Sequence, residues 1–175
     1  MMVLRCTQKL LSRLKMTGDL PPVASTTRLG DWYGNILRFG RHQFLIFISE
    51  HSRLAVVLPV RDAKRLPEIL PDTISDLLAE FGIPAAEIED ERDRMSRVSF
   101  DRTRNRSLLG TLNDYVMMAR YGYWQRGMPE SPGELMRFLA QTPILPLKGA
   151  SPIELTRAAF GLPPSPTRKR VTRVK

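Results

Sequence analysis

The pattern of apolar and polar positions predicts a short strand at the start of the chain, followed at once by a helix. Residues 3–6 are strand-like, and Thr7 can cap a helix in which Leu10, Leu11 and Leu14 recur at helical spacing. Residues 17–30 are rich in turn-forming types. The chain is therefore expected to cross from this first unit to the next as a loop.

Three strand-like apolar runs follow, at residues 32–39, 44–49 and 54–60. Only short polar segments separate them, and such short connections predict an antiparallel three-strand meander. The last two runs are almost continuously apolar, which indicates that both faces of those strands are covered. A further strand is expected at 97–100.

Helical spacing dominates the segments between and after these strands. A helix is expected over 62–81, broken by Pro67 and Pro71, and a short acidic one over 85–93. The clearest helix spans 107–124, with Ser107 as its cap. The fold class expected for residues 1–126 is therefore α+β: an antiparallel sheet of four or five strands packed by helices.

The pattern changes after residue 126. Two segments, 131–137 and 151–157, each begin with Ser, Pro and, at the third helical position, Glu, which together complete a capping box. They predict a helical C-terminal appendage over 127–163, too small for a core of its own. It is expected to pack on the main domain or on a partner.

The net charge of +9 is unevenly distributed. Residues 1–18 and 164–175 contain basic but no acidic side chains, and the segment between them is neutral. Residues 164–175 also lack apolar periodicity and are expected to be disordered. This tail, with Arg168, Lys169 and Arg170, is either a solubilising end or a contact with a polyanion. No basic face is expected on the neutral body.

Composition excludes several classes of protein. One cysteine, Cys6, cannot form an intrachain disulfide, which fits a reducing cytoplasm. The longest apolar stretch, 54–60, is far too short to cross a bilayer, so no membrane contact is expected. Neither a phosphate-binding glycine loop nor a metal-ligand spacing occurs, since His42 and His51 are isolated. No cofactor and no metal are therefore expected.

One loop has the composition of an anion site. Arg102, Arg104 and Arg106 precede and enter the helix expected to start at Ser107. Backbone N–H groups at a helix N-terminus favour anions, and a guanidinium group binds phosphate through two hydrogen bonds. The loop is thus a candidate for contact with phosphate.

Three segments, LRCTQKLL, STTRLGDWYGNILRF and VSFDRTRNRSLLGTLNDY, together resemble an uncharacterised bacterial family of domains of unknown function, sometimes found on plasmids. The resemblance covers about residues 3–120 and implies a common fold and a common site, without an assigned activity. The polar positions that it singles out as site candidates are Thr7, Lys9, Asp31, Asn35, Arg106 and Asn113.

A structural role for the same residues stays open. Thr7 and Ser107 can act only as helix caps, and Arg106 can pair with Asp31 or Asp114 to hold the sheet against the helix. Cys6 is either a buried small side chain or, beside Lys9, an activated thiol.

Three functions remain compatible with the sequence. The leading one is a small cytoplasmic binding protein that contacts an anionic partner, nucleic acid or an acidic protein. The second is a hydrolase or transferase for a phosphate-containing substrate that uses Lys9, Asp31, Arg106 and Asn113. The third is a regulatory or antitoxin-like module that docks through residues 131–160. The sequence leaves the oligomeric state open.

Overall fold

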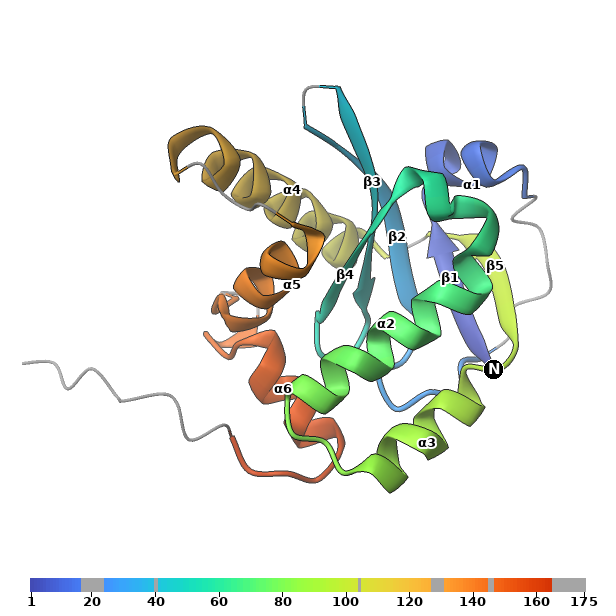
Figure 1. Cartoon of the computed structure of the whole chain (residues 1–175), viewed down its shortest axis with the longest axis vertical. Helices are drawn as coiled ribbons and strands as arrows, with labels where there is room; N and C mark the ends of the chain where they lie inside the picture. Colours follow the sequence, from blue (N-terminus) through green and yellow to red (C-terminus); the bar gives the residue numbers. More distant parts are fainter. Residues whose placement is uncertain (17–23, 40, 104, 127–130, 145–146, 165–175) are drawn as a thin grey trace, which may run out of the picture.

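A single five-stranded sheet organises the part of the chain described by the computed structural model, residues 1–16, 24–39, 41–103, 105–126, 131–144 and 147–164 (Figure 1). The order of the strands across the sheet is β4-β3-β2-β1-β5. Their bounds are β1 Met2–Cys6, β2 Trp32–Phe39, β3 His42–Ser49, β4 Ala55–Pro59 and β5 Val98–Arg102.

The expected α+β class and the three-strand meander are confirmed, but the sheet as a whole is mixed. β2, β3 and β4 pair in antiparallel fashion, whereas β1 is parallel to both β2 and β5. For the pair of β1 and β2, the reason lies in the connection after β1. The chain passes through helix α1 (Gln8–Leu14) before it enters β2, and a long crossover of this kind returns it to the same end of the sheet.

Helices cover both faces of the sheet. Helix α2 (Leu66–Glu80) crosses one face, and α4 (Arg106–Arg126) lies behind the sheet in the same view (Figure 1). The remaining elements are a 3-10 helix η1 (Val60–Arg65) and the helices α3 (Ala85–Arg94), α5 (Pro132–Gln141) and α6 (Pro152–Ala159).

Two local expectations were wrong. The helix expected over 62–81 is divided next to Pro67, since η1 ends at Arg65 and α2 begins at Leu66 with Pro67 in its first turn, where no donor is needed. Pro71 does not break it, since α2 runs through this residue and buries it beside Leu70 and Ile74. The cap of α4 is Asn105 rather than Ser107. The Asn105 side-chain oxygen accepts from the backbone N–H groups of Ser107 (3.0 Å) and Leu108 (3.2 Å).

Both predicted C-terminal helices are present. Helix α5 buries Leu135 and Leu139 in the common hydrophobic core and packs beside β4. Helix α6 follows Ser151, whose backbone N–H donates to Glu154 at 2.8 Å. The expected boundary at 126/127 borders residues 127–130, which lie outside the described part of the chain, as do tail residues 165–175. No helix of the described residues combines the length and hydropathy needed to cross a membrane.

Gly34 of β2 marks a close approach between the sheet and helix α1. A Cβ atom built at this position would lie 2.5 Å from a ring carbon of Phe47 and 2.8 Å from a methyl carbon of Leu10. Both neighbours are fully buried. Only a residue without a side chain therefore fits between β3 and α1 at this point.

We expect Gly34→Ala to lower the free energy of unfolding by about 1–3 kcal/mol, because the added methyl group overpacks a rigid core. Gly110→Ala is the matched control. Gly110 lies inside α4 with open space around it, and alanine there should raise stability by about 0.5–1 kcal/mol. Urea unfolding measures both, and equal effects of the two substitutions would contradict the close approach.

Candidate functional site

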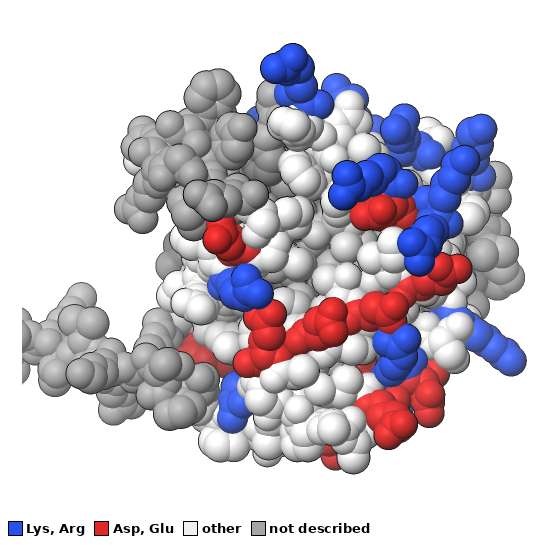
Figure 2. All heavy atoms as spheres, in the orientation of Figure 1, with Lys and Arg blue, Asp and Glu red and all other residues white. Residues whose placement is uncertain are grey.

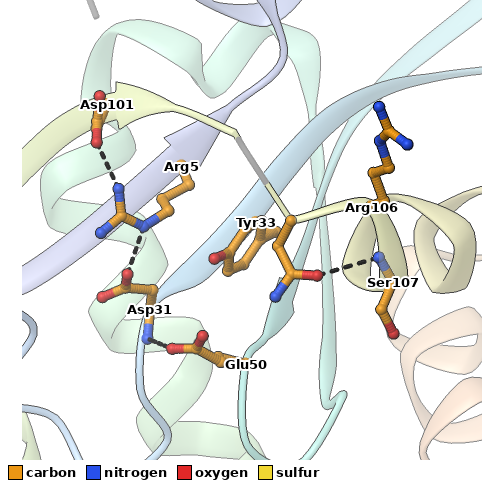
Figure 3. Close-up of a pocket in the computed structure, with 8 residues that line it drawn as sticks. Arg5, Asp31, Tyr33, Glu50, Asp101, Arg106 and Ser107 are labelled. Atoms are coloured by element: carbon orange, nitrogen blue, oxygen red, sulfur yellow. Dashed lines mark hydrogen bonds and ion pairs between the residues drawn. The ribbon is translucent and has the colours of Figure 1, made fainter. Parts of the chain in front are cut away.

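The parallel half of the sheet places three polar side chains in one row. Register pairs Arg5 of β1 with Tyr33 of β2 on one side and with Asp101 of β5 on the other. Paired residues of neighbouring strands point to the same face of a sheet. This face therefore carries an acid, a guanidinium and a phenol side by side (Figure 3).

Arg5 forms two ion pairs in this row. Its Nε donates to Asp31 at 2.5 Å, and its Nη1 donates to Asp101. The three side chains are only 17%, 10% and 7% exposed. Burial alone would lower the pKa of Arg5, and the two carboxylates overcome this effect and raise it. The guanidinium thus joins β1 to β5 and to the residue just before β2.

A tight turn before β2 sets the position of Asp31. Gly30 has a φ of 75°, and a Cβ at this position would lie 2.9 Å from the ring of His51. The Thr27 hydroxyl donates to the carbonyl of Gly30 at 2.7 Å. The carbonyl of Asp31 then accepts from the backbone N–H of Glu50 at 2.8 Å. The glycine of the LGDWY segment is therefore required by backbone geometry.

Glu91 of α3 holds the same turn from outside the sheet. Its carboxylate is fully buried and accepts from the backbone N–H of Arg28, with 3.0 Å to each oxygen. Burial raises the pKa of Glu91, and the hydrogen bonds from the Arg28 and Leu29 backbone oppose that rise in part. Helix α3 thereby helps to fix the segment that carries Asp31.

The beginning of α4 forms the opposite wall. Arg106 and Ser107 lie in its first turn, next to the capping residue Asn105. Figure 3 shows Tyr33 between the Arg5–Asp31 pair and this turn, with the Arg106 guanidinium directed away from Arg5. Burial and then the charge of Glu50 raise the pKa of the Tyr33 phenol, and the smaller opposing effects of Arg5 and Asn105 do not cancel that rise. Tyr33 therefore stays protonated at neutral pH.

These elements enclose a cleft of about 650 Å³. It stays uncovered because α4 packs mainly on β2 and β3 and leaves the β1–β5 part of this face open. The lining residues are Arg5, Asp31, Tyr33, Glu50, Asp101, Asn105, Arg106 and Ser107. Three carboxylates therefore face two guanidinium groups, one of which is already held by two of the acids.

The chemistry available in the cleft is that of hydrogen bonding and charge. No group of three or more metal-ligating side chains that could hold a metal ion occurs among the described residues. Burial raises the pKa of the Cys6 thiol to about 12, which removes the activated-thiol alternative at neutral pH. The cleft offers fixed acceptors, a phenol donor and one exposed cation, Arg106.

Only part of the site expected from the sequence assembles. Asp31, Arg106 and Ser107 line the cleft. The partner of Asp31 is Arg5 rather than Arg106. Thr7 caps α1 and donates to Asn35 at 3.0 Å, so these two residues form a separate pair beside β2.

The other expected residues lie elsewhere. Lys9 and Asn113 are exposed on α1 and α4 and do not line the cleft. Arg102 is exposed at the end of β5. The remaining anion candidates, Arg104, Arg168, Lys169 and Arg170, lie outside the described residues.

Sequence reasoning did not assign Arg5, Tyr33, Glu50, Asp101 and Asn105 to the site. A signal was present in β1, because Arg5 interrupts a strand that is otherwise apolar. Arg5 and Asp101 lie side by side because β1 and β5 are parallel, whereas the sequence predicted an antiparallel sheet.

Comparison with protein families gives a match to a family described as a domain of unknown function (DUF6933), over residues 3–155. The match extends past residue 120, where the resemblance seen in the sequence ends, and it includes α5. Neither the curated proteins nor the solved structures contain a match.

We expect Arg5→Met to lower the free energy of unfolding by about 3 kcal/mol, because it leaves two buried carboxylates without their cation. The triple variant Arg5→Met, Asp31→Asn, Asp101→Asn removes all three charges and should recover at least half of that loss. Urea unfolding at neutral pH measures both. A triple variant less stable than Arg5→Met would refute the ion-pair account.

Glu91→Gln should change how stability depends on pH. The pKa of Glu91 is raised in the folded protein, so protonation of Glu91 favours the folded state. This contribution to stability is fully present below the pKa of the unfolded chain, about 4.3, and is lost as pH rises through the pKa of the folded protein. Glutamine cannot ionise, so the stability of Glu91→Gln relative to the natural protein should increase between pH 4 and pH 7. A decrease over this range, measured by urea unfolding, would contradict the assignment.

Proposed function

The chain belongs to the DUF6933 family, and from this premise we propose that its function is to bind a small ligand in the cleft beside β1. The observation that supports this proposal is that residues from three separate segments line the same cleft. Arg5 comes from the first family-like segment, Asp31 and Tyr33 from the second, and Asn105 and Arg106 from the third. Segments far apart in the chain thus supply one cavity.

The charge of the cleft favours a positively charged ligand that donates hydrogen bonds. Asp31 and Asp101 already share Arg5, while Glu50 adds a third carboxylate to the lining of the cleft. A Glu50 oxygen accepts only one long hydrogen bond, 3.3 Å from the backbone N–H of Asp31, among the contacts of the described residues. An ammonium or guanidinium group fits such acceptors better than a phosphate does.

The phosphate-directed enzyme is a weaker proposal for this cleft. Of the four residues that it requires, Asp31 and Arg106 line the cavity, whereas Lys9 and Asn113 do not. An anionic substrate would also meet an excess of carboxylates. A docking module built on α5 has less support as well, since its apolar residues Leu135 and Leu139 are buried within the domain.

The location that we propose for this binding is the cytoplasm. The only cysteine, Cys6, is buried as a free thiol. A domain stabilised by its hydrophobic core and by ion pairs, rather than by disulfides, does not require an oxidising compartment.

The proposal is tested by amide chemical shifts of the labelled protein during titration with agmatine and putrescine as cations and with inorganic phosphate as the anion. The cations should shift the amides of Asp31, Tyr33 and Ser107, and phosphate should not shift them. Glu50→Gln should weaken the binding of the cations about tenfold, since it removes one carboxylate and leaves both Arg5 pairs intact.

Glu89→Gln is the matched control, because Glu89 is an exposed carboxylate of α3 that does not line the cleft. It should leave the affinity for the cations unchanged. Shifts of the cleft amides by phosphate alone, or no shift of these amides with any of the three probes, would refute the proposal.

A further inference from the structure

A second surface, distinct from the cleft, carries a concentration of positive charge. It is formed by α1, by the β2–β3 hairpin and by η1, and we call it the basic end. Its exposed cations are Lys9, Arg13, Lys15, Arg38, Arg41, Arg61, Lys64 and Arg65. Figure 2 shows blue side chains gathered over this region. On the same elements, Asp62 is the one acidic residue.

The acids that balance this charge lie elsewhere. Exposed carboxylates recur at every fourth position of α2, at Glu68, Asp72, Asp76 and Glu80, and form the red diagonal in Figure 2. Residues four apart lie on one side of a helix. Residues 19–163 carry no net charge in total, but their exposed basic and acidic side chains lie on different parts of the surface.

The cations of the basic end form few ion pairs with the rest of the described residues. Among the described residues, one ion pair involves them, between Arg65 and Glu68 at 3.2 Å, with both side chains 70% exposed. Arg41, His42 and Arg61 also line a cavity of about 390 Å³ between the hairpin, η1 and Pro132. Charge from two separate elements thus converges on a concave surface.

The shape of the basic end indicates which polyanion it fits. The β2–β3 hairpin projects beyond the helices (Figure 1), and register places Arg38 opposite Gln43 near its end. A two-stranded ribbon fits the major groove of B-form DNA. The major groove of an RNA duplex is too narrow and deep for side chains to read.

We propose that the basic end binds duplex DNA, with the β2–β3 hairpin in the major groove and the cations of α1 and η1 on the flanking phosphates. Such binding depends on salt, because each neutralised phosphate releases counterions. It is independent of the cleft, whose ligand carries the opposite charge.

The test is fluorescence anisotropy of the full chain with a short mixed-sequence DNA duplex over a series of salt concentrations. The variant Arg41→Gln, Arg61→Gln, Lys64→Gln should weaken binding at least tenfold at low salt. It should also reduce the slope of log K against log salt by about 2–3, close to one for each lost phosphate contact. All three substitutions are at exposed positions.

Two further variants remove the same charge from other places. Arg97→Gln, Arg120→Gln, Lys148→Gln changes exposed cations outside the basic end, and it should alter affinity less than twofold. Arg168→Gln, Lys169→Gln, Arg170→Gln tests the tail, and it should leave the preference for the duplex intact. Equal losses in all three variants, or a loss confined to the tail variant, would overturn the proposal.

Competition identifies the class of the partner. The same duplex as RNA, the single DNA strand, poly-glutamate and phosphatidylserine vesicles should each displace the DNA at least tenfold less effectively than unlabelled duplex DNA. Displacement by any of them at the same concentration as duplex DNA would overturn the proposal. Should the first variant not fold, as judged by circular dichroism, Lys9→Gln, Arg13→Gln, Lys64→Gln replaces it with the same expected losses.

Discussion

The ion pairs of Arg5 are the interaction on which the parallel half of the structure depends. A buried carboxylate needs a cation or hydrogen-bond donors nearby, and Arg5 serves both Asp31 and Asp101. It thereby joins the end of β1 to β5 and to the turn before β2. The same interaction determines the charge of the cleft, because Arg5 is already paired with two carboxylates and Glu50 lines the cleft as an additional acid.

Charge is segregated over the surface of the described residues. Carboxylates line the cleft and one side of α2, while the exposed cations gather on α1, the hairpin and η1. Each surface is built from elements far apart in the sequence. The two proposals thus concern separate surfaces of opposite sign, and the ligand of one is not expected to compete with the ligand of the other.

Local patterns predicted most of the elements, because helical spacing, caps and short turns act within a few residues. The meander of β2, β3 and β4 and the helices after Ser131 and Ser151 follow from such signals. The position of β1 does not, since parallel pairing is decided by a crossover and by long-range packing. For that reason Asp31 and Arg106 were found as site residues, whereas Arg5 and Asp101 were missed. The basic end was missed for a similar reason: its charges come from three separate segments.

The central claim, that two surfaces of opposite sign exist on one domain, is tested most directly by paramagnetic relaxation with small nitroxides of either charge. The rate enhancement at each backbone amide reports how strongly the probe concentrates nearby. We expect the cationic nitroxide to be enriched at the amides of Asp31 and Ser107 and the anionic nitroxide at those of Lys9, Arg41 and Lys64. Equal enhancement by both probes at the two surfaces would contradict the account.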